Sequence, residues 1–231
     1  MRHDYQKAKE KICEKANQEG WVFFVMAIST FTELKTSIAN FLNRDDLTAT
    51  IPDFISLAES SINNEIRHWR METRAETTID SQFTGIPTDW LSTIRFHLVT
   101  TGTSSLDFMS LATMQASRAA RNNSTGTPTN YSLNSSQFEV FPTPDGSYSA
   151  ILMYYAKIPT LSDSATTNWL LTHHPDIYLY GALLHSAPYL KEDERAQTWA
   201  ALYSAAVARV NTASSRSTAS GSGLRLKIGS Y

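Results

Sequence analysis

Residues 168–194 read NWLLTHHPDIYLYGALLHSAPYLKEDE and predict a helix that lies in the core of the protein. Pro175 suits a first helical turn, where its missing N–H would have no partner, and Asp176 complements the positive end of the helix dipole. Apolar residues follow on most sides of this helix, as is typical of a helix buried on several sides. Pro188 is expected to end it, because proline lacks an amide donor and clashes with the preceding turn. We therefore interpret His174, Pro175 and Asp176 as a structural motif that starts a buried helix.

Three histidines in the same stretch, His173, His174 and His185, raise the question of a metal site. His173 and His174 are adjacent, so on a helix they point roughly 100° apart. His174 and His185 share a face but lie about 16 Å apart, and one zinc ion cannot bridge that distance. The HExxH pattern is absent. The spacing favours helix capping, and a metal-dependent hydrolase built on this stretch is a less favoured hypothesis.

The rest of the chain contains no nucleophile elbow, no P-loop and no dinucleotide-binding glycine pattern after a strand. A net charge of −2 gives no general attraction for nucleic acid. The single cysteine, Cys13, cannot form an internal disulfide, which fits a reducing compartment. No apolar run approaches the ~20 residues that a membrane helix needs. We therefore expect a protein that is not an enzyme, needs no cofactor and does not enter a membrane.

Two amphipathic helices are predicted between residues 26 and 76. The first begins at a capping box, Thr30 to Glu33, and carries apolar residues on one face. The second begins at Pro52 and carries apolar residues on one face as far as Trp69. Because a short polar turn joins them, we expect an antiparallel pair.

A basic stripe is predicted at the end of this second helix, where Arg67, Arg70 and Arg74 recur at helical spacing. One interpretation is a nucleic-acid-binding module that uses this stripe, because arginine and aromatic side chains both serve such binding. The other is that the cations complement the C-terminal end of the helix dipole while Trp69 lies in the core.

The hydrophobic period changes from Thr77 onward, and residues 77–160 predict an antiparallel sheet. Ile94, Phe96, Leu98 and Thr100 alternate with polar or basic neighbours. Asp145-Gly146 lies between two strand-like runs, 138–141 and 148–155, and is a hairpin signal. One short helix is expected around 111–120, followed by a polar loop.

The two ends of the chain differ from its middle. Residues 1–25 are charge-rich; either they form a short helix, or they are an extension upstream of a natural start at Met26. Residues 214–231 are rich in Ser and Gly and contain no acid, so they are expected to be a flexible tail. Within this tail an apolar–basic alternation predicts a short strand that orders on a neighbouring protein. A frayed terminus is the other interpretation.

The expected fold class is α+β and mainly helical: an antiparallel helical bundle with an inserted antiparallel β-sheet or hairpin region and an extended C-terminal tail. The expected parts are an N-terminal extension (1–25), a helical pair (26–76), the β-rich insertion (77–160), the C-terminal helices of the bundle (161–213) and the tail (214–231).

Several segments, in this order, resemble the head–tail adaptor, or connector, proteins of tailed phages. They are FTELKTSIANFLNRDDLTATIPDFISLAESSINNEIR, METRAETT, IPTDWL, FEVFPTPDGSYSAILMYYAKIPTLSD and TNWLLTHHPDIYLYGALLHSAPYLKEDER. The resemblance covers the chain from about Met26 to Tyr231.

The resemblance implies a structural protein of the virion, assembled in the host cytoplasm and located where head meets tail. Its copies would form a ring, matching the twelve-fold symmetry of the portal protein above it. The ring would extend the channel through which genomic DNA passes without sequence preference, and would present a platform for tail nozzle or tail-fibre proteins. The C-terminal tail would bind the portal; its expected contact residues are Arg216, Leu224, Arg225, Leu226, Lys227, Ile228 and Tyr231.

Overall fold

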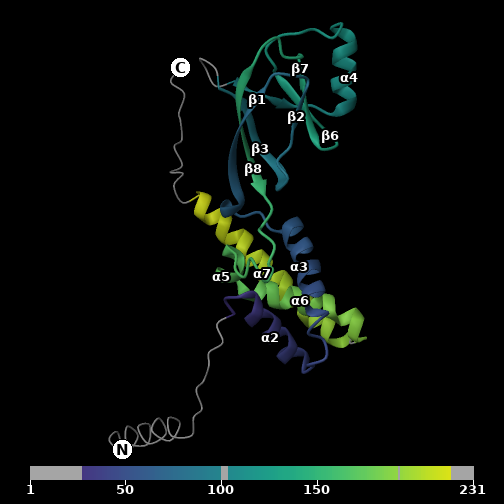
Figure 1. Cartoon of the computed structure of the whole chain (residues 1–231), viewed down its shortest axis with the longest axis vertical. Helices are drawn as coiled ribbons and strands as arrows, with labels where there is room; N and C mark the ends of the chain where they lie inside the picture. The colour runs from purple at the N-terminus through teal and green to yellow at the C-terminus, as the bar shows by residue number, and fades with distance from the viewer. Residues whose placement is uncertain (1–27, 100–103, 192, 220–231) are drawn as a thin grey trace, which may run out of the picture.

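A layer of helices forms one end of the molecule, and two β-sheets with one short helix form the other (Figure 1). The computed structural model describes residues 28–99, 104–191 and 193–219. The helices are α2 (Phe31–Leu42), α3 (Ile51–Glu65), α4 (Leu111–Ala120), α5 (Trp169–His173), α6 (Pro175–Leu190) and α7 (Asp193–Ala219), with a 3₁₀ turn at Trp69–Met71. The strands are β1 (Glu72–Ile79), β2 (Phe83–Gly85), β3 (Trp90–Leu98), β4 (Ser104–Ser105), β5 (Asp107–Phe108), β6 (Asn130–Asn134), β7 (Gln137–Phe141) and β8 (Tyr148–Ala156).

The predicted helical bundle with one inserted sheet is wrong, although the α+β class is right. The described strands form two four-stranded sheets, in the orders β1-β8-β3-β4 and β2-β7-β6-β5. Pairing is antiparallel except between β5 and β6, which are parallel. The sheets pack face to face over their own apolar core, which includes Phe96, Phe138 and Leu152. The β region therefore has a core separate from that of the helices, which alternation along single strands does not reveal.

The predicted hairpin across Asp145-Gly146 is also wrong. β7 and β8 lie in different sheets, so the chain between them crosses from one sheet to the other. β7 has β2 and β6 on its two edges, and β8 has β1 and β3. Each strand is thus already paired on both sides, and the turn residues cannot bring the two strands together.

The alternation expected in β3 is broken at one position. Phe96 is 1% exposed and Leu98 is fully buried, but Ile94 is 42% exposed. The pairing of β3 with β8 shifts register between Thr93 and Arg95. An irregularity of this kind turns a side chain to the other face of the sheet. Thr100, the last residue of the predicted pattern, lies outside the described residues.

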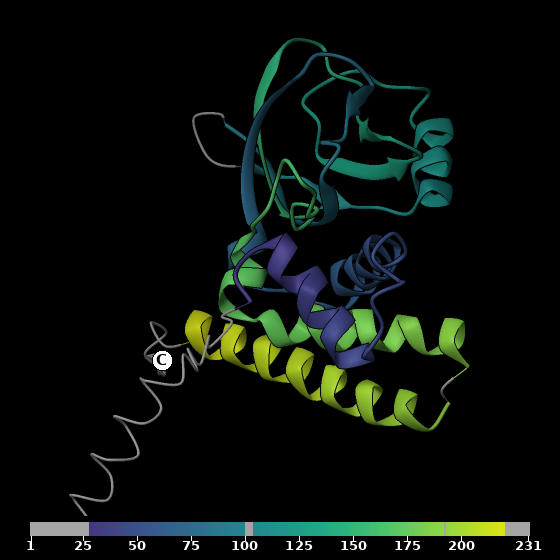
Figure 2. The ribbon, with the colours of Figure 1, turned by 60° about the horizontal axis from the view of Figure 1, so that its bottom comes forward.

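In the helical layer, α6 contacts α2, α3 and α7 and is buried on several sides (Figure 2). α2 begins at the predicted capping box: the Glu33 N–H donates to Thr30 Oγ1 at 3.2 Å, and the Thr30 N–H donates to Glu33 Oε2 at 3.0 Å. Gly181 on α6 allows the closest approach, because a Cβ there would lie 3.1 Å from the Ala58 Cβ and 3.3 Å from the Tyr203 ring. None of the described helices is long and apolar enough to cross a bilayer.

Two helix ends differ from the sequence prediction. Pro188 lies inside α6, which continues to Leu190 and ends at Lys191 in the left-handed conformation (φ 57°). A proline inside a helix removes one hydrogen bond and crowds the carbonyl one turn back, and α6 runs only two residues past it.

α7 continues to Ala219, so residues 214–219 and Arg216 belong to a helix rather than to a flexible tail. Hydroxyl groups of Ser215 and Ser217 donate to carbonyls one turn back, at 3.1 and 3.0 Å. The predictions for residues 1–25 and for Leu224, Arg225, Leu226, Lys227, Ile228 and Tyr231 lie outside the described residues.

Candidate protein–protein interface

The three residues of the predicted helix-start motif take separate roles. His174 occupies the N-cap position of α6, but its side chain makes no capping hydrogen bond. Pro175 is the first residue of the helix. Asp176 lies in the first turn and forms an ion pair with Arg209 on α7. This ion pair joins the start of α6 to the second half of α7.

The described histidines do not form a metal site. No group of three or more His, Cys, Asp or Glu side chains in the described ranges could hold a metal ion. His185 instead contacts the Ser61 hydroxyl, with its Nε2 3.2 Å from Oγ. His173 and His174 lie at the other end of α6, as the helical spacing predicted.

The predicted basic stripe does not exist, because α3 ends at Glu65 and the chain turns extended at Ile66. The three arginines therefore lie on different structures. Arg67 donates to the carbonyls of Asn63 and Ile66, at 2.7 and 2.6 Å, and so caps α3. Arg74 lies on β1 and pairs with Glu76 at 2.7 Å. Arg67 is thus held at the end of α3 and does not join Arg70 and Arg74 in one helical row.

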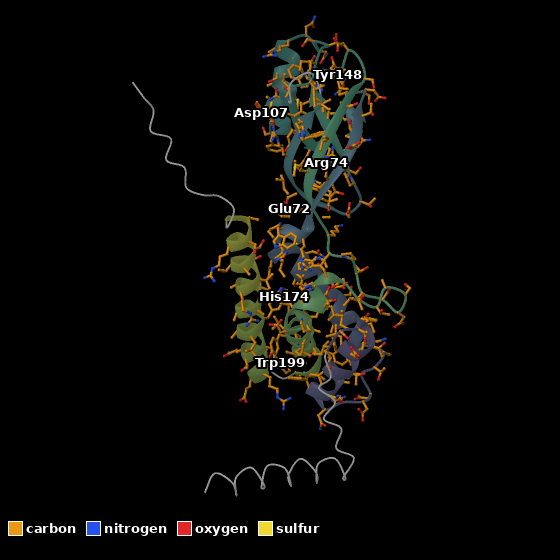
Figure 3. All side chains as sticks on the ribbon, turned by 90° about the vertical axis from the view of Figure 1, so that its left-hand side faces the viewer. Glu72, Arg74, Asp107, Tyr148, His174 and Trp199 are labelled. Carbon is orange, nitrogen blue, oxygen red and sulfur yellow. The ribbon has the colours of Figure 1, made fainter. Side chains whose placement is uncertain are left out.

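Arg70 lies instead in a recess where the helices meet the sheets. Its lining residues are His68, Trp69, Arg70, Trp169, His173 and His174. Trp69 is 44% exposed, which corrects the prediction that it lies in the core. Figure 3 shows His174 among the helices and Glu72 just beyond them, at the start of β1.

Contacts from two helices hold the recess in shape. Asn168 caps α5: its Oδ1 accepts the Leu171 N–H at 2.8 Å, and its Nδ2 donates to the Tyr178 hydroxyl at 2.7 Å. On the opposite side, the Trp69 N–H donates to Ser214 Oγ on α7 at 3.0 Å. The two tryptophans of the recess are therefore fixed by segments far apart in the sequence.

His68 forms the floor of the recess and is 7% exposed. Its ring stacks on Trp169 at a centroid distance of 4.9 Å, and its Nδ1 accepts the Arg70 N–H at 3.1 Å. Burial lowers the pKa of His68, and the nearby charges of His174, Arg70 and His173 lower it further. The neutral ring is thus both the stacking partner and a hydrogen-bond acceptor in this floor.

Arg70 is oriented by two neighbours. Its Nη1 lies 3.1 Å from His173 Nε2, and its guanidinium carbon lies 5.2 Å from the centroid of the Trp69 ring. His173 Nδ1 is 2.9 Å from the Trp169 carbonyl, so a ring protonated at Nδ1 donates there and accepts from Arg70 at Nε2. Among the described residues, no carboxylate lies within 4 Å of Arg70. The remaining N–H groups of this arginine are therefore available to an acidic partner.

The outer face of the β1-β8-β3 sheet continues this surface. The cross-strand register sets Arg74, Met153 and Arg95 side by side in one row. Met153 and Arg74 also line a hollow that contains Trp69 and Arg70. Along each strand, side chains at alternate positions fill the core between the two sheets. The side chains at the remaining positions form the outer face and point away from that core. The recess and this face make one continuous surface, because Trp69 and Arg70 line both hollows.

Sequence reasoning missed the recess because its two halves are about a hundred residues apart. The only local signal was the density of His, Trp and Arg at 68–70 and again at 169–174. In a comparison with protein families, the model described as SU10 adaptor protein aligns with residues 29–225. No curated protein matches the chain. The matched range includes both the helical layer and the two sheets.

Proposed function

The chain belongs to the SU10 adaptor protein family, and on this premise we propose that it forms a ring beneath the portal of a tailed phage. The family membership makes it a phage adaptor, a structural component of the virion rather than an enzyme. Beyond family membership, the proposal is that the ring extends the channel for genomic DNA and connects the head to the tail. The family match carries this proposal, because it covers almost all of the described chain.

The surface of the monomer supports a role in assembly. Large apolar side chains are exposed on both the helical layer and the sheets, at Phe41, Leu57, Trp69, Phe83, Ile94, Val99, Phe108, Leu111, Leu133, Tyr189 and Leu202. Exposed apolar side chains mark interaction sites where they form a contiguous patch. A portal above, a tail protein below and a copy on either side would account for them.

We propose that portal binding is made by residues 220–231. Residues 214–219 complete α7, and Ser214 holds Trp69 in place, so this proposal concerns the residues beyond the helix; contact of Arg216 with the portal stays a prediction. The alternation of Leu224, Leu226 and Ile228 with Arg225 and Lys227 fits a segment that adds to a partner. Many identical copies around a ring would strengthen weak individual contacts through avidity.

The test is electron microscopy of the protein mixed with its portal protein. The full chain is expected to decorate portal rings, and a chain that stops at Ala219 is expected to stay folded but not to decorate them. A matched control replaces Ser220 and Ser222 with alanine and should decorate as the full chain does. Failure of the full chain to bind portal would contradict the proposed function, whereas decoration by the shortened chain would contradict only the role of residues 220–231.

A further inference from the structure

The helical layer has the exposed guanidinium of Arg70 at one end and several exposed carboxylates at the other. We define the junction end by Trp69, Arg70 and His173, where the layer meets the sheets. We define the distal end by residues 43–50, 190–191 and 193–194 at the opposite side. Figure 2 shows the end of α6 and the start of α7 at the side of the layer away from α5. The Phe54 ring lies 5.6 Å from the Tyr189 ring, so the start of α3 joins the same end.

The distal end exposes three large apolar side chains from three different helices. Phe41 in the last turn of α2 is 54% exposed, Leu57 in the second turn of α3 is 52% exposed, and Tyr189 in the last turn of α6 is 58% exposed. Asp53 and Leu57 are four residues apart on α3 and therefore share a face. Exposed apolar groups next to acidic ones are typical of an interaction surface.

The acidic groups of the distal end are Asp45, Asp53 and Glu194. All three are exposed, and the structure shows no Lys, Arg or His nitrogen within 4 Å of them in its described part. The turn itself, residues 191–195, reads KEDER and holds three acids against two bases. Carboxylates without a partner at this end complement the unpaired guanidinium of Arg70 at the other end.

The two ends cannot meet within one chain. From Asp53 to Glu65, α3 advances by about 18 Å at 1.5 Å per residue, and the junction end lies beyond Glu65. From Glu194 to Ser214, which holds Trp69, α7 advances by roughly 30 Å. The complementary groups can therefore pair only between molecules.

We propose that the distal end of one copy docks on the junction end of a second copy, with a distal carboxylate bound to Arg70 and an apolar side chain packed on Trp69. Tryptophan and arginine are the residues that most often dominate binding energy at protein interfaces. Trp69 is half exposed on the rim of a recess and Arg70 is already oriented by His173, so little ordering is needed on binding. Contact between unlike surfaces is heterologous, and such contacts close into rings when the rotation between copies permits.

Nucleic acid is a poorer occupant of the junction end. Glu72 and Glu76 are exposed on β1 beside the recess, and the chain as a whole carries a net charge of −2. A phosphate backbone needs a run of cations along its length, whereas Arg74 on this surface is already paired with Glu76. A single carboxylate of a protein partner, in contrast, needs only one cation, and Arg70 supplies it.

The inference rests on the proposed function only in supposing that copies assemble side by side, and a charge exchange tests it directly. Arg70→Glu should weaken association between copies by roughly 30-fold or more, because it sets like charges together at the interface. Asp53→Lys combined with Glu194→Lys should do the same. A chain carrying all three changes should recover most of the association. Arg121→Glu, an equal change of charge at the C-cap of α4, serves as the control and should associate as the unaltered protein does.

Association is measured by sedimentation velocity of the free protein and by the number of copies on portal rings, with circular dichroism to establish that each variant is folded. A photo-crosslinker at position 69 should join to residues 41–57 or 189–195 of another copy. Normal association of folded Arg70→Glu, no recovery in the triple variant, or crosslinks elsewhere would each overturn the inference while portal binding by the unaltered protein still upheld the proposed function. No association of the unaltered protein in either assay would overturn both.

Discussion

Arg118 on α4 and Glu139 on β7 form a buried ion pair, with Nε 2.8 Å from Oε1 and side chains 6% and 0% exposed. The same guanidinium donates to the Val140 carbonyl at 2.5 Å and to Thr143 Oγ1 at 2.9 Å. Gln82 Nε2 also donates to Glu139 Oε1, at 3.0 Å. The pair therefore fastens α4 to the outer side of the β2-β7-β6-β5 sheet.

Replacing Arg118 with methionine should lower the free energy of unfolding by about 3–5 kcal/mol, because Glu139 would remain buried without its cation. Urea denaturation followed by circular dichroism measures the change. The control is Arg74→Ala, which removes an exposed ion pair with Glu76 and should cost about 1 kcal/mol or less. Equal losses of unfolding free energy in the two variants would show that the buried ion pair contributes no more to stability than the exposed one.

Replacing Thr30 with alanine should destabilise the protein by about 1 kcal/mol, because the first turn of α2 loses its capping oxygen. Thr30→Ser keeps the hydroxyl and should cost much less. Thr36 also lies on α2, where its hydroxyl donates to the Thr32 carbonyl at 3.0 Å on the exposed side. Thermal unfolding of Thr30→Ala, Thr30→Ser and Thr36→Ala tests this prediction. It is contradicted if Thr30→Ala loses no more stability than Thr30→Ser and Thr36→Ala do.

Replacing Gly181 with valine should destabilise the protein by about 1–3 kcal/mol or more, since α6 cannot move away from α3 and α7 at once. A Cβ at this position would lie 3.1 Å from the Ala58 Cβ. Ala58→Gly in the same chain removes that atom and should restore part of the loss. Unfolding in urea of the two single variants and the double variant measures the coupling, and strict additivity would show that the close contact is not the cause.

The stability of the fold should fall as the pH drops below about 6.5, the ordinary pKa of histidine. Burial lowers the pKa of His68 in the folded protein, so the unfolded chain binds a proton at a higher pH than the folded one. Protons therefore favour unfolding between pH 6.5 and the lowered pKa, and the contribution is fully present above pH 6.5. Burial lowers the pKa of His97, His174 and His185 as well, which adds to the effect.

His68→Asn, which retains an acceptor for the Arg70 N–H, should flatten the dependence of the unfolding free energy on pH between 5.5 and 7.5. Urea denaturation across this range measures the slope. Thr36→Ala, at an exposed position on α2, should keep the slope of the unaltered protein. An unchanged slope in His68→Asn would mean that His68 does not contribute.

The helix starts could be predicted because each depends on residues within one turn. Thr30 and Glu33 bond to each other's backbone, and Pro175 and Asp176 suit a first turn wherever it lies. The short helix around 111–120 was predicted on the same local basis and has those bounds in the structure. The end of α6 was misplaced because the prediction ended the helix at Pro188, whereas the helix runs two residues past it.

Strand pairing could not be predicted in the same way. The residues of β7 and β8 alternate as strands do, and Asp145-Gly146 suits a tight turn, yet the partners of each strand come from elsewhere in the chain. β8 pairs with β1 and β3, more than fifty residues earlier. Which strands meet depends on the total apolar area that two sheets bury together, and no single stretch carries that information.

The sequence by itself determined where α2, α3 and α6 begin, that the runs 138–141 and 148–155 are strands, and that the chain resembles phage adaptors, because these depend on short-range geometry and on residue order. Only the tertiary structure decided which groups surround the Arg70 guanidinium. A helical stripe with Arg67 and Arg74 would have made it one cation of three. Instead α3 ends at Glu65, and His173, 103 residues away, orients the guanidinium beside the exposed Trp69. A side chain's partners are set by the packing of whole elements, so its function follows from the fold and not from its neighbours in sequence.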